Sequence, residues 1–94
     1  MSDTIYRRSV VHFGVEEQTR KAAEECVELS LELLHALDGR ANMDKIAEEM
    51  ADVEIMLEQL RLIYGADDVE AWKLKKLNGL ALRIDEITAN ATPI

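Results

Sequence analysis

The chain has 94 residues, of which 48% are hydrophobic, and its 19 acidic and 11 basic residues give a net charge of -8. This length predicts a single domain over residues 1–94. The acid excess argues against nucleic acid as a partner, because proteins that bind it present a basic face to the phosphates. The hydrophobic fraction exceeds what a thin layer of three helices needs, so we expect self-association.

The sequence also lacks the usual signals for export or membrane insertion. No basic segment leads into an apolar run near Met1, and no apolar run approaches the length of a membrane span. Cys26 is the only cysteine, which excludes an intrachain disulfide, and we interpret it as a small core residue. We therefore expect a cytoplasmic protein with no membrane partner.

Helical patterns cover most of the chain. Residues 1–14 form an N-terminal arm, either a short helix or an extended segment that packs on a partner, and Gly14 ends it. Residues 15–38 predict a long amphipathic helix, and Gly39 is suited to a left-handed stop. Its glutamates lie on the side opposite its main apolar row, and a second apolar row lies beside the first. The main row consists of Val15, Thr19, Ala22, Cys26, Leu29, Leu33 and Leu37.

Two further helices follow. Residues 43–64 predict a helix with Asn42 as its N-cap and Gly65 at its end. A third helix begins with Asp67-Asp68-Val69-Glu70, a cap residue followed three positions later by glutamate, and continues to Ile87. Residues 88–94 are expected to fray. The predicted fold is all-α, an antiparallel bundle of three main helices per chain that is completed by oligomerisation.

Acidic residues are concentrated in two short motifs, Glu24-Glu25-x-x-Glu28 and Glu48-Glu49-x-x-Asp52. Acids three or four residues apart share one helix face. Folding the chain back between residues 40 and 41 places residues whose numbers sum to about 81 at the same height. The two motifs then come together, with Glu28 opposite Asp52 or Val53 and Glu25 opposite Met56. Hard divalent cations prefer several carboxylate oxygens from rigid elements, so the spacing predicts a magnesium site. The alternative is a solvated acidic face.

This pair of motifs resembles the signature of the MazG-type all-α nucleotide pyrophosphohydrolases, and is most similar to small phage and bacterial members. Gly14, Gln18, the segment 51–60 and the segment 72–77 also fit, so the resemblance covers roughly residues 12–84. It implies an enzyme that cleaves a nucleoside triphosphate between the α and β phosphates, giving a monophosphate and pyrophosphate. It further implies a homodimer or homotetramer that uses Mg²⁺, with Mn²⁺ as the alternative.

The resemblance also assigns roles to individual residues. Glu24 and Glu48 match acids that orient the ligands or help to deprotonate the attacking water. Lys73 and Lys76 match cations that bind phosphate, whereas Arg83 lies a turn beyond the position expected for an arginine. The expected metal ligands are Glu25, Glu28, Glu49 and Asp52. The base, the sugar and the number of metal ions are left open.

Other interpretations stand beside this one. Glu32-x-x-His35 is half of a carboxylate-bridged di-iron motif, and a dimer would have to supply the second half. Trp72 fits either base stacking or an apolar interface. The whole chain could instead be a non-enzymatic helical dimerisation or adaptor protein whose acids are merely solvated.

Overall fold

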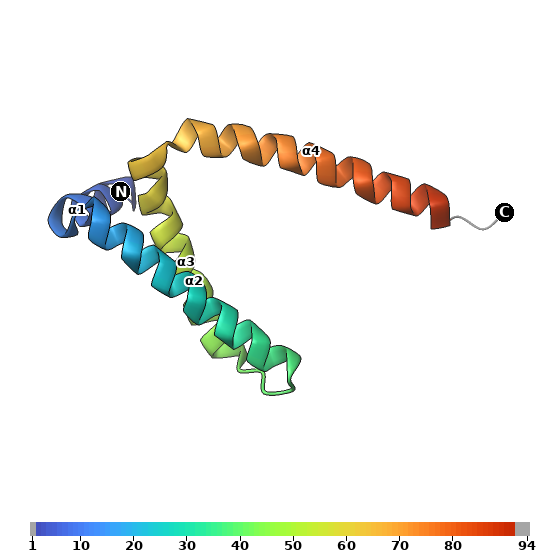
Figure 1. Ribbon diagram of the computed structural model, residues 1–94, viewed down its shortest axis with the longest axis horizontal. Coiled ribbons are helices and arrows are strands. Elements are labelled where there is room, and N and C mark those ends of the chain that lie inside the picture. The colour runs from blue at the N-terminus through green and yellow to red at the C-terminus, as the bar shows by residue number, and fades with distance from the viewer. Residues whose placement is uncertain (1, 92–94) are drawn as a thin grey trace. The chain divides into compact units, whose positions relative to one another are not determined.

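The structure is a computed structural model that describes residues 2–91, and these residues form four α-helices without a strand. The all-α prediction is therefore confirmed for this part of the chain. The N-terminal arm is itself a helix, so four helices are present where the sequence predicted three main ones. They are α1 (Ser2–Phe13), α2 (Val15–Leu37), α3 (Met43–Tyr64) and α4 (Ala66–Ala91), as Figure 1 shows.

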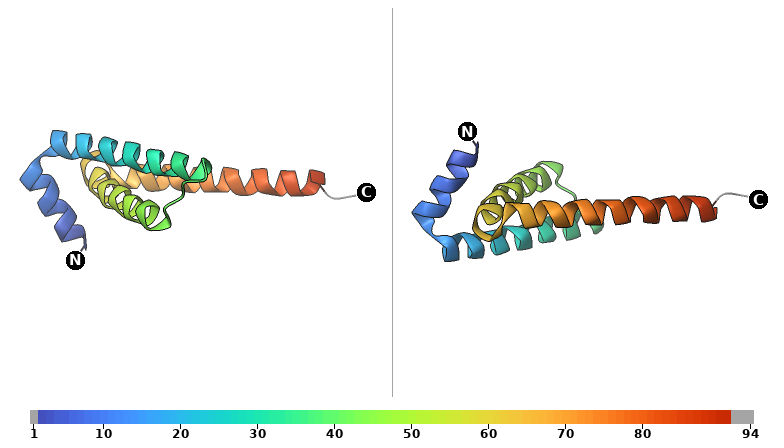
Figure 2. Two further views of the ribbon diagram at one scale, coloured as in Figure 1. Left: turned by 90° about the horizontal axis from the view of Figure 1, so that it is seen from below. Right: turned by 90° about the horizontal axis from the view of Figure 1, so that it is seen from above.

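The described chain divides into two compact units, one ending at Tyr64 and the other beginning at Gly65. In the first unit α2 and α3 lie side by side and antiparallel, and α1 contacts both of them (Figure 2). The second unit consists of α4. None of the helices within residues 2–91 is long and apolar enough to cross a membrane.

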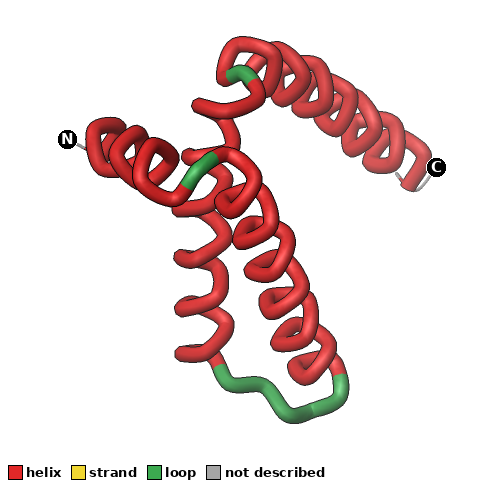
Figure 3. The backbone as a smooth tube through the Cα atoms, turned by 60° about the vertical axis from the view of Figure 1, so that its left-hand side comes forward, coloured by secondary structure: helices red, strands yellow, loops and turns green. Residues whose placement is uncertain are grey.

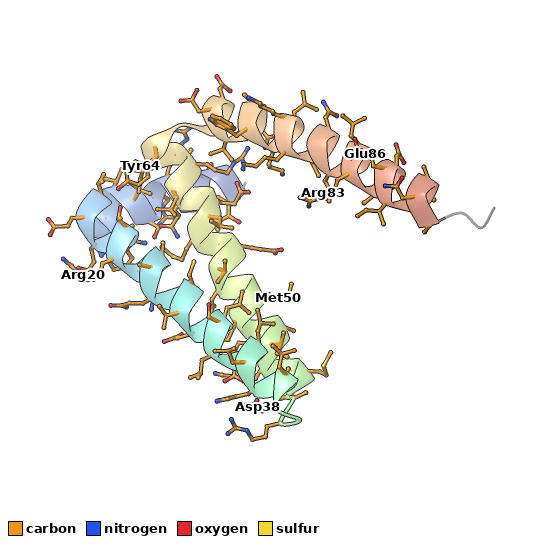
Figure 4. The ribbon with its side chains drawn as sticks, turned by 45° about the vertical axis from the view of Figure 1, so that its right-hand side comes forward. Arg20, Asp38, Met50, Tyr64, Arg83 and Glu86 are labelled. Atoms are coloured by element: carbon orange, nitrogen blue, oxygen red, sulfur yellow. The ribbon has the colours of Figure 1, made fainter. Side chains whose placement is uncertain are left out.

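The helix boundaries follow local signals in the sequence (Figure 3). Gly39 has φ +81°, which confirms the predicted left-handed stop after α2. Asn42 Oδ1 accepts a hydrogen bond from the Lys45 backbone N–H at 3.0 Å, which confirms the predicted N-cap of α3. Asp38, labelled in Figure 4, lies at the start of the connection and pairs with Arg40 at 3.3 Å.

The second unit differs slightly from its prediction. Helix α4 begins at Ala66, so Asp67 lies inside its first turn and does not precede the helix. Aspartates there are favourable because the N-terminal end of a helix carries partial positive charge. The helix continues past Ile87 to Ala91, so most of the segment expected to fray is helical. Residues 92–94 of that segment lie outside the described residues.

The contact between α2 and α3 is unusually polar. Among the described residues only Ala22 and Met56 are buried apolar side chains, whereas four polar or charged ones are buried beside them. These four are Gln18, Glu25, Glu49 and Gln59. The predicted inward row of α2 is therefore wrong in part, because Cys26 and Leu33 are exposed. Helix α2 is apolar around much of its circumference, so the pattern alone did not determine which side meets α3.

A buried pair of amides aligns the two long helices. Gln18 Nε2 donates to Gln59 Oε1 at 2.7 Å and also lies 3.2 Å from Ser9 Oγ of α1. A symmetrical fold-back of the chain would instead have placed Gln18 opposite Ile63. The observed alignment differs from that prediction by about one helical turn. Because of this offset Glu25 lies near Asp52, where the fold-back predicted Met56.

Replacing Gln18 by leucine should destabilise the first unit. The change leaves Gln59 Oε1 and Ser9 Oγ without their donor, and an unsatisfied buried polar group costs about 1–3 kcal/mol. Chemical denaturation followed by circular dichroism would measure this loss in free energy of unfolding. Tyr64→Phe is the matched control, since it removes an exposed hydrogen bond to Thr19 and should change stability by less than about 0.5 kcal/mol. Equal effects of the two substitutions would contradict the prediction.

Candidate metal centre

Three of the four predicted metal ligands converge between α2 and α3. Glu25, Glu49 and Asp52 each offer a carboxylate oxygen, and these oxygens all lie within 4.8 Å of one another. Helix α2 supplies Glu25 from its middle, and α3 supplies the other two acids one turn apart. No other such group of three metal-ligating side chains occurs within residues 2–91.

Burial makes this cluster different from an ordinary acidic surface. Glu25 is 6% exposed and Glu49 is 3% exposed, although both carry ionisable carboxylates. Burying such a group is costly unless its oxygens are paired. Within the described part of the chain, Glu25 Oε2 and Glu49 Oε2 are buried without a hydrogen-bond partner. These two oxygens therefore lack the compensation that buried carboxylates normally receive.

Two lysines pair with the remaining oxygens of the buried glutamates. Lys21 Nζ lies 3.0 Å from Glu25 Oε1, and Lys45 Nζ lies 3.1 Å from Glu49 Oε1. These neighbours raise the pKa of both lysines, first through the hydrogen bond to the glutamate, so the ammonium form is favoured. Neither lysine is among the site residues predicted from the sequence. The signal that would have found them is the repeat of Lys-x-Ala-Glu-Glu-x-x-acid at residues 21–28 and 45–52.

The fourth predicted ligand, Glu28, lies at the exposed edge of this group. The charge of Glu25 raises the pKa of Glu28, and desolvation and Glu49 add to the effect. Burial raises the pKa of Asp52, and the charges of Glu25 and Glu49 raise it further. Both carboxyl groups are thus held where ionisation is electrostatically unfavourable. A proton on either carboxyl group, or a cation beside Glu25 and Glu49, would relieve this repulsion.

Acidification should stabilise the cation-free protein over a defined range. A carboxyl whose pKa is raised by folding binds its proton more tightly in the native state. Stability contributed by Asp52 and Glu28 therefore increases as the pH falls through their raised pKa toward the ordinary values of 3.8 and 4.5. Melting temperatures measured in a chelator from about pH 7 down to about pH 4 would check this. Asp52→Asn should flatten the curve, and an unchanged slope would contradict our interpretation.

The predicted catalytic acids lie outside the buried cluster. Glu24 and Glu48 are both exposed, and Glu48 Oε1 lies 3.2 Å from Lys45 Nζ. Lys45 thus lies within ion-pair distance of Glu48 as well as the buried Glu49. Neither Glu24 nor Glu48 belongs to the group of three converging oxygens, and their catalytic role stays a prediction.

The predicted phosphate ligands belong to α4. Lys73 and Lys76 are exposed there, with Lys73 Nζ 3.9 Å from Glu70. Lys75 and Lys76 lie 5.1 and 5.9 Å from the ring centroid of Trp72, within the range of cation–π contacts. Trp72 is itself exposed. Phosphate binding by this helix stays a prediction, as does any role for Arg83.

Within the described residues, no third metal-ligating side chain joins Glu32 and His35, the two residues of the di-iron alternative. His35 Nδ1 lies 3.9 Å from Glu32 Oε2, so the two side chains lie beside each other on α2. Neither residue belongs to a group of three metal-ligating side chains within the described chain. A pair of ligands from one helix is insufficient for the bridged site, which needs carboxylates from four helices.

The acidic cluster has the chemistry to hold a hard divalent cation. The four acids predicted as ligands face two lysine ammonium groups, which leaves two negative charges uncompensated when all four carboxylates are ionised. Glu25, Glu49 and Asp52 would hold such a cation, and their oxygens, which lie within 4.8 Å of one another, would have to move closer together around it. The unpartnered oxygens of Glu25 and Glu49 would then gain the partner they lack.

Comparisons with protein-family models, with characterised proteins and with solved structures found no match to this chain. The acidic cluster must therefore be interpreted from its own chemistry. Its distinctive features are the convergence of three acids from two helices and the burial of two of them without full pairing.

Proposed function

We propose that the protein is a magnesium-dependent nucleoside triphosphate pyrophosphohydrolase, which cleaves between the α and β phosphates. The observation that carries this proposal is the pair of buried, unpartnered oxygens of Glu25 and Glu49 beside Asp52. An unpaired buried carboxylate is expensive, and binding a divalent cation would compensate for it. The reaction and substrate are drawn from the resemblance of the two acidic motifs to the MazG-type signature.

The charge of the chain suits an enzyme that recruits a polyanion through a cation. A triphosphate would be repelled by a protein with a net charge of -8 unless bound metal neutralised its oxygens. When bound, Mg²⁺ polarises the phosphoryl group and lowers the pKa of a coordinated water. The protein itself would then have to position the metal and accept a proton.

We assign these tasks to different acids of the cluster. Glu25, Glu49 and Asp52 would hold the cation, since their oxygens already converge. Glu28 would complete the ligand set or accept the proton of the attacking water, because it is exposed and its pKa is raised. Glu24 and Glu48 would then act through their neighbours, and Lys73 and Lys76 would offset charge on the departing pyrophosphate.

The adaptor interpretation has one specific observation in its favour. Large apolar side chains are exposed on the outer faces of α2 and α3, including Val27, Leu31, Leu34 and Ile55. Such surfaces suit an interface with another protein. We propose that a second copy of the chain covers them, so that the protein is a homodimer or homotetramer. The adaptor interpretation also holds that the acids are merely solvated, and this does not account for the burial of Glu25 and Glu49.

The decisive experiment is product analysis with a panel of ribo- and deoxyribonucleoside triphosphates and Mg²⁺. Release of pyrophosphate together with the monophosphate from one or more substrates would support the proposal and narrow the base and sugar. Release of orthophosphate would overturn the bond that we assign. No product from any nucleotide, combined with no binding of Mg²⁺ by calorimetry, would overturn the enzyme and favour the adaptor.

A further inference from the structure

The two buried glutamates are arranged alike. In each helix the lysine four residues earlier approaches Oε1 of the glutamate, at 3.0 Å in the Lys21–Glu25 pair and 3.1 Å in the Lys45–Glu49 pair. In each glutamate the other oxygen, Oε2, is buried and lacks a hydrogen-bond partner within the described chain. One oxygen of each carboxylate is thus occupied by the protein, and one is left for a ligand.

We propose that Lys21 and Lys45 are positioning residues that make the site selective for a small divalent cation over a larger one. By occupying Oε1, each lysine restricts its glutamate to coordination through the single oxygen Oε2. This inference rests on the proposed function, because it requires that the Glu25–Glu49–Asp52 cluster binds a cation. Beyond that function, it states that the cluster prefers Mg²⁺ to Ca²⁺.

The selectivity follows from the coordination habits of the two common hard cations. Mg²⁺ takes six ligands in a tight octahedron, usually one oxygen from each carboxylate. Ca²⁺ takes six to eight oxygens and often binds both oxygens of a carboxylate. With Lys21 and Lys45 in place, the two buried glutamates offer Ca²⁺ two oxygens where free carboxylates would offer four. The site therefore offers too few oxygen ligands for Ca²⁺ but enough for Mg²⁺.

Charge compensation alone would give a different result. If the lysines only neutralised the glutamates, removing them would strengthen the binding of every divalent cation by a similar factor, since Mg²⁺ and Ca²⁺ carry the same charge. Control of coordination predicts instead that Ca²⁺ gains more than Mg²⁺. The ratio of the two dissociation constants separates these cases, whereas either constant alone does not.

The test uses Lys21→Met/Lys45→Met, which removes both ammonium groups and keeps an unbranched apolar side chain at each position. Dissociation constants for Mg²⁺ and Ca²⁺ are measured by titration calorimetry on the full chain without nucleotide. We expect the preference for Mg²⁺ over Ca²⁺ to fall by about tenfold or more, in line with the effect of groups that orient metal ligands. Lys75→Met, which removes a lysine of α4, should leave the ratio unchanged.

Further variants keep the inference testable if the double variant does not fold. Each single substitution, Lys21→Met or Lys45→Met, frees one oxygen and should shift the ratio in the same direction by a smaller factor. Lys45→Arg keeps a donor for Glu49 Oε1 and should retain the ratio of the unmodified protein. A folded variant whose ratio is unchanged would overturn this inference and leave the metal site standing. Absence of cation binding by the unmodified protein would overturn the proposed function and this inference with it.

Discussion

Saturating Mg²⁺ should raise the melting temperature by about 10–20 °C. At a free concentration 100 times the dissociation constant, a ligand that binds only the native state adds about 2.7 kcal/mol of stability. In a domain of this size each kcal/mol corresponds to several degrees. The stabilisation has a structural source, because the positive charge of the cation would offset the mutual repulsion of the carboxylates of Glu25, Glu49 and Asp52. Differential scanning fluorimetry with Mg²⁺ and with a chelator measures it.

The variant Asp52→Asn tests this explanation in two directions. Without divalent cations it should melt higher than the unmodified protein, since burial and the charges of Glu25 and Glu49 disfavour the ionised carboxyl. With Mg²⁺ it should gain much less than the unmodified protein, because one ligand oxygen is replaced by an amide. Glu54→Gln, which neutralises an exposed acid of α3 outside the cluster, should respond to Mg²⁺ fully. A full response of Asp52→Asn would contradict the assigned site.

Glu49→Gln should reduce kcat/KM for pyrophosphate release by more than about 100-fold. The amide keeps the size of the side chain and can still accept a hydrogen bond from Lys45, but it weakens a ligand to the cation. Even groups that only orient metal ligands typically cost 10–100-fold when changed, and loss of a ligand should cost more. Steady-state assays on the best substrate of the panel, at several Mg²⁺ concentrations, measure the effect.

Two controls make that result interpretable. Far-ultraviolet circular dichroism of Glu49→Gln should show unchanged helicity, because the amide side chain would occupy the same volume at the contact between α2 and α3. Glu54→Gln should keep kcat/KM within about twofold of the unmodified protein, as expected for an exposed side chain away from the cluster. If Glu49→Gln retained most of its activity while folded, the catalytic metal site would have to be placed elsewhere.

Local signals in the sequence predicted the helices well. Asn42 and Gly39 determine where α3 begins and α2 ends, through a side-chain cap and a left-handed residue that depend only on neighbouring atoms. Rotation about the helix axis was harder to predict. Apolar residues surround much of α2, and the amide contact between Gln18 and Gln59 decided which side faces α3. That contact joins residues far apart in sequence, so periodicity could not reveal it.

The candidate site was predictable only in part, because spacing along the helices indicates which acids can meet but not how their side chains are placed. The spacing of Glu25, Glu49 and Asp52 indicated that acids from two helices would meet, and they do converge. Their burial was not foreseen, since Glu25 was expected on the outer, charged side of its helix. The roles of Lys21 and Lys45 emerge only when each glutamate oxygen is considered separately. Such distinctions depend on side-chain conformations, which a sequence pattern does not specify.

The polar contact between α2 and α3 bears on how the chain folds. Hydrophobic burial is the main favourable term in folding, yet only Ala22 and Met56 are buried apolar residues among those described. If a second copy covers the outer faces, folding and association become one reaction. The rate of refolding would then depend on protein concentration, and the lone chain would pass through no stable native-like intermediate. The buried glutamates and glutamines would set how the helices align, while the driving force would come from the partner.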